Sequence, residues 1–328
     1  MERIRWGILG CADIVERRFL PALTKEVQNG EVYALASRGS SERLARVTAA
    51  YDIPKIYHDY DALLTDPAVD AVYIPVPNSL HAEWTVRAAR AKKYVLCEKP
   101  IACSVADVER ISAAAAENGV VVMEAFACLH SPLYGAIRDL IDAGEIGELM
   151  AVDSIFCYNM TDRGTNNIGN PALCGGSIYD VGCYNTLTIR RLTRREPVSV
   201  TAMAHFWDNG LDATVRAVLD MGDDLLCAYT SSVETVSRRG ISVLGTQGYI
   251  HFPHTPNTWG ELLITLSNAK GSREIKLHTR NTYALEMEQM GRCILQGERP
   301  LLTLEESARN VRALEMLHKA IGSWRSGV

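Results

Sequence analysis

The fold is decided close to the amino terminus by the stretch Ile4-Arg5-Trp6-Gly7-Ile8-Leu9-Gly10-Cys11-Ala12-Asp13-Ile14. This pattern predicts a short apolar strand that enters a glycine-bearing turn and continues into a helix. In such a turn the backbone approaches a pyrophosphate closely, and the first N–H groups of the helix point at the phosphates. We therefore expect a dinucleotide cradle, although similar turns also occur in α/β proteins that bind no nucleotide. The expected cofactor-binding residues here are Gly7, Gly10, Cys11, Ala12, Asp13 and Ile14.

The first part of the chain alternates short β-rich runs with helical patterns. Such alternation favours a doubly wound parallel sheet with helices on both faces. One helix is well delimited, because Ser104 and Asp107 resemble a capping box and Gly119 stands where a helix would end. Other helices are expected near residues 41–51 and 80–92. The strand candidates are residues 5–9, 32–37, 71–76, 94–97 and 120–123.

The second part has a different texture. A helix is expected at residues 133–143 and another at 304–324, where apolar residues recur at helical spacing and would pack back on the body of the protein. Between them, strands in direct succession indicate an α+β domain with an open, mostly antiparallel sheet. We predict two domains, 1–125 and 126–328. The strand candidates of the second are residues 150–158, 198–206, 214–220, 225–233, 241–244, 249–252 and 262–266.

An open antiparallel sheet needs a cover on each apolar face, and few helices are expected in the second domain. A second subunit would supply that cover. We therefore expect a homodimer or a higher homo-oligomer.

Composition excludes several kinds of partner. The 328 residues are 47% hydrophobic, and 34 basic against 39 acidic residues give a net charge of −5 without a long run of one sign. Nucleic acid and membrane partners are therefore not expected. No apolar run reaches the roughly 20 residues of a membrane span, and Met1-Glu2-Arg3 leads directly into a strand, which favours a cytoplasmic protein.

The cysteines and histidines do not form a metal-binding pattern. The nine cysteines are scattered and odd in number, which favours reduced thiols over disulfides. No cysteine pair has the spacing of a zinc ribbon, and the eight histidines form no short pair on a helix. No metal site is expected.

The end of the second strand bears on the choice of cofactor. An enzyme specific for NAD would usually place an acidic residue there to hold the ribose 2′-hydroxyl, whereas this chain has Ser37 and Arg38. A guanidinium and a hydroxyl suit a 2′-phosphate, so we expect NADP, with NAD as the other possibility. The alternative is an arginine on a solvated loop.

A strand that ends in Pro75-Val76-Pro77-Asn78 and leads to His81 lies at the same expected edge of the sheet. Ligands of doubly wound folds bind at this edge, so Pro77, Asn78 and His81 are candidate cofactor residues. A rigid connection in which His81 only caps a helix is an equal alternative.

The stretch Val95-Leu96-Cys97-Glu98-Lys99-Pro100 places a lysine between a carboxylate and a proline where an apolar strand ends. A hydride leaving an alcohol carbon must be matched by loss of the hydroxyl proton, and a lysine of lowered pKa can take and return that proton. Lys99 is therefore the candidate proton-transfer residue, and a lysine on a solvated loop is the alternative.

A second cluster, Asp180-Val181-Gly182-Cys183-Tyr184, follows Gly175 and Gly176. If the segment is helical, Asp180 lies one turn before Tyr184 and both face the same way. Tyr184 could hold the substrate oxygen, and the two glycines would allow close approach. The alternatives are that Asp180 caps a helix and that Tyr184 is a half-buried aromatic residue.

Taken together, these motifs resemble the glucose-fructose oxidoreductase, inositol dehydrogenase and MocA family, Gfo/Idh/MocA, over nearly the whole chain. The resemblance implies a Rossmann domain that binds NAD(P) and a carboxyl-terminal α+β domain. It implies that Lys99 transfers the proton, that Pro100 follows a cis bond and that Glu98 and Lys99 lie near the nicotinamide. The motifs are Gly7-Ile8-Leu9-Gly10, Pro77-Asn78-Ser79-Leu80-His81, Val95 to Pro100, Met123-Glu124-Ala125-Phe126, Gly175-Gly176 and Asp180 to Tyr184.

Tyrosine at position 184 resembles the branch that contains dihydrodiol dehydrogenase and glucose-fructose oxidoreductase, whose substrates are sugars, cyclic polyols or their ketones. The chain departs from that branch where Cys128-Leu129 replace an aromatic-arginine pair and where Ile168 replaces an arginine. Both changes remove hydrogen-bond donors from the substrate side.

The leading hypothesis is thus an NAD(P)-dependent oxidoreductase, NADP-preferring, that acts on a CH–OH group of a sugar, cyclic polyol or dihydrodiol. Lys99, Tyr184 and Asp180 are its expected catalytic residues. A non-catalytic NADP(H)-binding redox sensor or regulator is the alternative from another class, since fold does not fix function. A structural oligomer with a vestigial site is a third.

Overall fold

The computed structural model describes residues 3–38, 42–162 and 167–326. The chain folds as two compact units. The first comprises Met1–His130 and Arg280–Ala308, and the second comprises Ser131–Thr279 and Arg309–Val328. The stretch Arg280–Ala308 therefore groups with the amino-terminal part of the chain, whereas the sequence pattern had assigned it to the second domain.

The first unit is built on a parallel sheet of the order β3-β2-β1-β4-β5-β6. The order reverses between β1 and β4, which makes the carboxyl ends of these two strands the switch point where doubly wound folds bind ligands. The strands are β1 (Ile4–Leu9), β2 (Gly30–Ala36), β3 (Lys55–Tyr57), β4 (Ala71–Ile74), β5 (Tyr94–Glu98) and β6 (Val122–Ala125).

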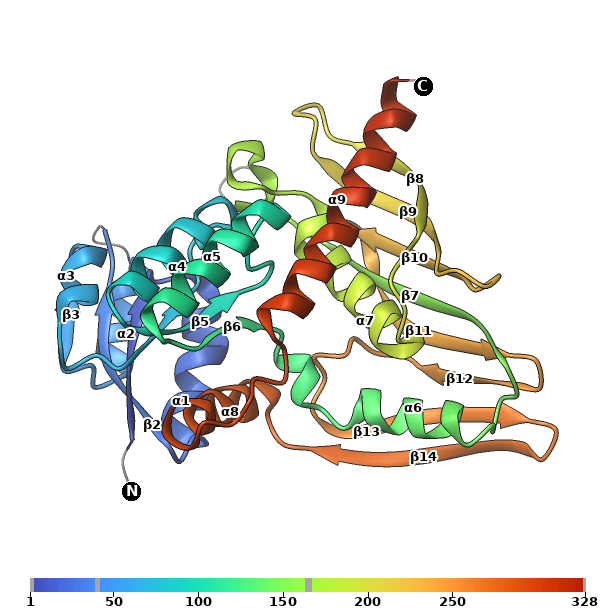
Figure 1. The fold of residues 1–328 in the computed structure, drawn as a ribbon, viewed down its shortest axis with the longest axis horizontal. Coiled ribbons are helices and arrows are strands. Elements are labelled where there is room, and N and C mark those ends of the chain that lie inside the picture. The colour runs from blue at the N-terminus through green and yellow to red at the C-terminus, as the bar shows by residue number, and fades with distance from the viewer. Residues whose placement is uncertain (1–2, 39–41, 163–166, 327–328) are drawn as a thin grey trace. The chain divides into compact units, whose positions relative to one another are not determined.

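Helices cover both faces of this sheet (Figure 1). One face is covered by a continuous helix made of η1 (Val15–Phe19) and α1 (Leu20–Lys25), by α2 (Glu42–Ala50) and by α8 (Thr282–Gln296). The opposite face of the sheet is covered by α3 (Tyr60–Thr65), α4 (His81–Arg90) and α5 (Val105–Asn118). The short helices η2 (Asn78–Leu80) and η3 (Ala127–His130) follow β4 and β6.

A large aromatic cluster lies at the centre of the first unit. Phe19 stacks on Tyr73 with ring centroids 3.9 Å apart, and Trp6 meets Phe19 edge to face at 5.7 Å. Ala284, Met287 and Met290 of α8 belong to the same buried core. Burial of such side chains stabilises a fold by about 1.5–3 kcal/mol for each large one, so α8 is an integral part of this unit.

The second unit contains an eight-stranded sheet of the order β14-β13-β12-β11-β7-β10-β9-β8. Only β7 and β10 pair in parallel among the neighbours in this sheet, so it is mostly antiparallel, as expected. The strands are β7 (Leu149–Asn159), β8 (Ser199–Phe206), β9 (Asp212–Asp220), β10 (Leu226–Ser232), β11 (Glu234–Gly245), β12 (Gly248–Phe252), β13 (Gly260–Asn268) and β14 (Gly271–Thr279).

Three helices lie on one face of this sheet, namely α6 (Leu133–Asp142), α7 (Cys183–Thr193) and the part of α9 (Leu304–Ser326) from Arg309 onward (Figure 1). Short helical turns η4 (Asn167–Gly169), η5 (Pro171–Leu173) and η6 (Ile178–Gly182) precede α7. Ser154 of β7 donates a hydrogen bond to Asn185 of α7, with 2.7 Å between the oxygen atoms. α7 therefore rests directly on the middle of the sheet.

The fold class predicted from the sequence is confirmed, with a Rossmann sheet followed by an α+β unit. The nine cysteines are all free thiols. Over residues 3–38, 42–162 and 167–326, the structure contains no helix whose length and hydropathy would let it cross a bilayer.

Candidate functional site

The dinucleotide cradle predicted at the amino terminus lies at the carboxyl end of β1. Gly10 has a φ of +110°, a conformation that favours glycine, and its N–H donates to the carbonyl of Ala36 at the end of β2. Cys11, Ala12, Asp13 and Ile14 follow as partly exposed residues, and the helix that contains η1 starts at residue 13. The open backbone and the start of this helix fit a pyrophosphate.

Gly7 has a different local role. It lies inside β1, and a Cβ atom there would stand 2.7 Å from Cδ2 of Leu63 and 2.9 Å from Cγ1 of Val69. The glycine thus makes room for the side chains on the α3 face of the sheet. The structure gives Gly7 a packing role beneath the cradle, in contrast to the direct approach to pyrophosphate expected from the sequence.

The residues chosen for the 2′-phosphate lie just beyond β2. Ser37 is buried, and its N–H donates to the carbonyl of Tyr57. Arg38 is exposed, with its guanidinium carbon 4.8 Å from the centroid of the Tyr60 ring. Sequence reasoning missed Arg43, whose Nη1 donates to the carbonyl of Cys11 at 3.3 Å. Arg38 and Arg43 thus bring two positive charges to the region that follows β2.

His81, a predicted cofactor residue, is 1% exposed and contacts only backbone in its hydrogen bonds. Its Nδ1 lies 2.7 Å from the carbonyl oxygen of Pro100, and its Nε2 lies 2.7 Å from that of Val76. Burial lowers the pKa of His81 to about 4. A neutral imidazole carries one N–H, so His81 donates to one of these two carbonyls and only contacts the other. Both carbonyls belong to the loops after β4 and β5, so His81 supports the backbone beside Pro77 and Asn78.

Lys99 immediately follows β5 and is partly exposed. The backbone N–H of Lys99 donates to Oε2 of Glu98 at 3.2 Å. Oε1 of Glu98 accepts a 2.6 Å hydrogen bond from the hydroxyl of Tyr73. The Lys99–Pro100 peptide bond is cis, as the family resemblance implied. The carboxylate of Glu98 is therefore fixed directly beside the proposed proton-transfer residue.

A buried glutamate in α8 adds to this acidic environment and was not found from the sequence. Glu286 is 2% exposed, and its Oε1 atom has no hydrogen-bond partner among the described residues. Burial, followed by the charges of Glu98 and Glu124, raises the pKa of Glu286 well above its ordinary value. This environment favours the neutral form of the Glu286 carboxyl group. No signal in the sequence singled out Glu286, because the buried face of α8 also contains Thr282 and Gln289 and the helix itself had not been predicted.

The second unit brings Asp180 and Tyr184 to one face of β7. The hydroxyl of Tyr158 donates to Oδ2 of Asp180 at 2.6 Å, and the ring of Tyr184 lies 5.6 Å from that of Phe156. Phe156 and Tyr158 are two residues apart on one strand and so point the same way. Tyr184 is 7% exposed. The predicted neighbourhood of Asp180 and Tyr184 is thus present within this unit.

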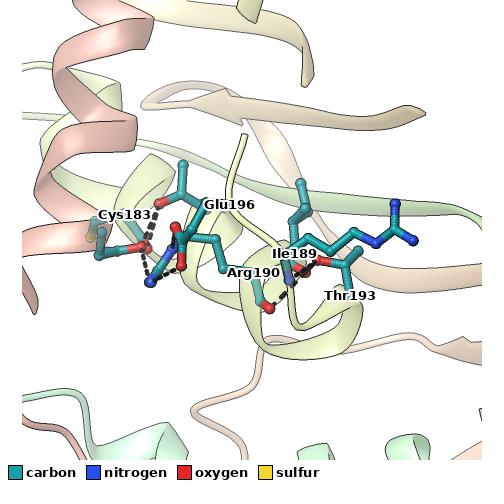
Figure 2. Close-up of polar contacts among 8 residues, drawn as sticks. Cys183, Ile189, Arg190, Thr193 and Glu196 are labelled. Carbon is teal, nitrogen blue, oxygen red and sulfur yellow. Dashed lines mark hydrogen bonds and ion pairs between the residues drawn. The ribbon is translucent and has the colours of Figure 1, made fainter. Parts of the chain in front are cut away.

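A buried polar network fixes the helix that carries Tyr184 (Figure 2). Arg190 of α7 forms a two-pronged ion pair with Glu196, with distances of 2.6 and 2.7 Å, and its side chain is 2% exposed. The carbonyl of Cys183 accepts hydrogen bonds from Thr186 at 3.0 Å and from Asn310 of α9 at 3.2 Å. The residue directly before Tyr184 is therefore held from two helices.

The two units together contain the parts of a nucleotide-dependent oxidoreductase, namely a Rossmann sheet with a glycine turn and, in each unit, polar groups suited to handling a proton. Comparison with known proteins agrees. Residues 4–126 match the model of the GFO/IDH/MocA oxidoreductase family with its NAD-binding Rossmann fold, and residues 134–251 match the GFO/IDH/MocA carboxyl-terminal domain. The chain belongs to this family. Its class, an oxidoreductase with a nicotinamide dinucleotide cofactor, is thereby confirmed.

Several relatives have named activities. The chain is 38% identical to a dTDP-3,4-didehydro-2,6-dideoxy-alpha-D-glucose 3-reductase from Streptomyces violaceoruber, over 76% of this chain and 72% of that protein. It is 32% identical to a D-xylose 1-dehydrogenase (NADP(+)) from Haloferax volcanii, over 96% of each. Among solved structures, a 3-ketoreductase from Actinomadura kijaniata in complex with NADP and TDP-benzene has a TM-score of 0.90 at 29% identity, over 97% of this chain and 98% of that one.

Proposed function

We propose that this protein is an NADP-preferring oxidoreductase that moves a hydride between the nicotinamide and a CH–OH or carbonyl group of a sugar, cyclic polyol or dihydrodiol. The observation that carries the proposal is a partly exposed lysine, Lys99, beside the fixed carboxylate of Glu98 at the carboxyl edge of a Rossmann sheet. Relatives named as sugar dehydrogenases and ketosugar reductases support the substrate class.

Proton handling follows from the residues of this chain. In the oxidative direction the hydroxyl proton of the substrate passes to the neutral amine of Lys99, and in the reductive direction the ammonium returns it to the carbonyl oxygen. The hydroxyl of Tyr184 would orient and polarise the same oxygen, and Asp180 would hold the sugar or tune Lys99. The bound nicotinamide supplies the hydride acceptor or donor.

Preference for NADP is proposed from charge. Arg38, Ser37 and the additional Arg43 surround the end of β2 with hydrogen-bond donors and positive charge, which suits a 2′-phosphate. Gly10 to Ile14 would take the pyrophosphate, while Pro77, Asn78, Glu98 and Lys99 would face the nicotinamide end. Gly7 and His81 would not contact the cofactor and would support the backbone of its binding site.

We also propose that the protein is located in the cytoplasm.

The proposal is tested by adding NADPH or NADP to the purified protein with a panel of aldoses, cyclic polyols, dihydrodiols and ketosugars. We expect quenching of intrinsic fluorescence by the cofactor and a change in nicotinamide absorbance with at least one class of substrate. Cofactor binding without turnover over the whole panel would favour the redox sensor, and absence of binding would favour a structural oligomer.

We further propose that the protein is a homodimer joined through the face of the eight-stranded sheet opposite α7. Met203 of β8, Val218 of β9 and Leu226 of β10 are 58%, 45% and 53% exposed on this face. Asp153 and Arg216 lie on the same face two strands apart, and neither has an ion-pair partner among the described residues. In a two-fold dimer, Asp153 of one copy would face Arg216 of the other, so the surface would be complementary to itself in charge.

Substitution of Val218 by glutamate should separate the subunits. Each dimer would bury two uncompensated carboxylates, at a cost of about 3–5 kcal/mol for each, so the dissociation constant should rise by roughly ten-thousand-fold or more. Sedimentation should then show a particle near the chain mass of 36.1 kDa. Val198→Glu is the control, because Val198 is 65% exposed and precedes β8 outside this face. A wild-type monomer would contradict the proposed interface.

A further inference from the structure

The turn that carries Asp180 is held in place by the buried carboxylate of Asp212. Asp212, the first residue of β9, is 3% exposed. Its Oδ2 accepts hydrogen bonds from the backbone N–H of Ile178 at 2.8 Å and from the hydroxyl of Ser177 at 2.9 Å. Ser177 in turn lies 3.0 Å from the hydroxyl of Ser231 on β10. Asp212 therefore ties the start of η6 to the sheet.

The glycine before this turn is explained by the same carboxylate. Gly176 has a φ of +97°, and a Cβ atom built there would collide with Oδ1 of Asp212. The carbonyl of Gly176 accepts a hydrogen bond from the N–H of Asp180 at 3.2 Å. The sequence predicted a close approach at Gly176, and the group that approaches its Cα is the carboxylate of Asp212. The N–H of Asp180 bonds to the carbonyl of the same glycine.

We propose that Asp212 is a positioning residue, which sets the turn over residues 177–182 and thereby holds Asp180 and Tyr184 in place for the proposed reaction. Burial of a carboxylate is costly unless its hydrogen bonds are made, and here they are made to the first N–H of the turn that bears Asp180. Burial raises the pKa of Asp212 to about 6, so at neutral pH it is ionised and accepts charge-assisted hydrogen bonds. The effect of Asp212 on the rate rests on the proposed function, because it requires that Tyr184 and Asp180 contact the substrate. Its effect on the turn does not.

The test compares Asp212→Ala with the conservative Asp212→Asn. Displacement of catalytic groups by about 1 Å costs on the order of a hundred-fold in rate, so Asp212→Ala should lower kcat by roughly ten- to a hundred-fold. Asparagine keeps an oxygen that accepts from Ile178, and should restore most of the loss. The KM for NADPH and the affinity for NADPH should be unchanged in both variants. Asp220→Asn, at the other end of the same strand, is the matched control.

Hydrogen exchange provides a readout that does not depend on turnover. Asp212→Ala should increase exchange in the peptide that contains residues 177–184, while peptides of β13 and β14 and of the first unit keep wild-type exchange. Equal increases across the second unit would mean that Asp212 serves folding alone, and unchanged exchange with unchanged kcat would also overturn the proposal. If the wild-type protein turns over no substrate, the proposed function fails, whereas this inference is still decided by the exchange pattern.

Discussion

Replacement of Lys99 by methionine is expected to lower kcat about a hundred- to ten-thousand-fold, because a positioned proton-transfer group contributes a factor of this size. Methionine keeps the length and apolar stem of lysine but has no group that can exchange a proton. NADPH should still bind, since the cradle at Gly10 to Ile14 and the cations at Arg38 and Arg43 lie elsewhere in the first unit. Steady-state rates and fluorescence titration with NADPH measure the two quantities separately.

The dependence of rate on pH gives the sharper form of this test. Under the proposed role, the neutral amine of Lys99 takes the hydroxyl proton in the oxidative direction, so kcat/KM of the wild-type protein should rise with pH. This rise should be absent in Lys99→Met. Lys25→Met, at an exposed position at the end of α1, should behave as wild type. Near-normal turnover by Lys99→Met would reject Lys99 as the proton-transfer residue.

Replacement of Arg38 by alanine is expected to weaken NADPH binding roughly ten- to a hundred-fold and to leave NADH nearly unchanged. A hydrogen bond to a charged group contributes about 1.5–3 kcal/mol, which corresponds to that range of affinity. The structure places the Arg38 guanidinium over the Tyr60 ring, at the end of β2 where the ribose of a dinucleotide lies in this fold. Dissociation constants for both cofactors, measured side by side, check the prediction.

Two further variants make the Arg38 result specific. Arg90→Ala, at an exposed site at the end of α4, controls for a general loss of positive charge. Arg43→Ala asks whether the second cation shares the phosphate. Equal weakening of NADPH and NADH by Arg38→Ala would show that Arg38 binds a part common to both cofactors, and the basis for NADP preference would be lost.

Much of the first unit could be predicted because the central strands of its parallel sheet are buried on both faces and therefore form continuous apolar runs. Strands of the second unit could be predicted because buried and exposed residues alternate along them. The exceptions are instructive. β3 has only three residues, two of them exposed, and β14 is exposed along most of its length, so neither has an apolar pattern. α8 was missed because its buried face includes Glu286 and Gln289 as well as Met287 and Met290. Polar residues at buried positions break the periodicity on which prediction depends.

The candidate site was predictable where chemistry depends on neighbours in the sequence. Glu98 beside Lys99 and Asp180 one turn before Tyr184 are local arrangements, and the structure places Tyr73 and Tyr158 against their carboxylates. The roles of Gly7, Gly176 and His81 depend instead on residues distant in the sequence. A sequence shows that a side chain is missing or polar at such positions, but only the fold shows which atom fills the space or accepts the hydrogen bond.

The contribution of α8 to the first unit has a consequence for biosynthesis. Trp6 and Phe19 leave the ribosome early, yet Ala284, Met287 and Met290, which complete their core, are made about 270 residues later. The nascent first unit must therefore keep an uncovered apolar surface until α8 has been made. Gene fragments that stop near the predicted boundary at residue 125 would yield a half with the same vacancy, exposed to aggregation and to chaperones.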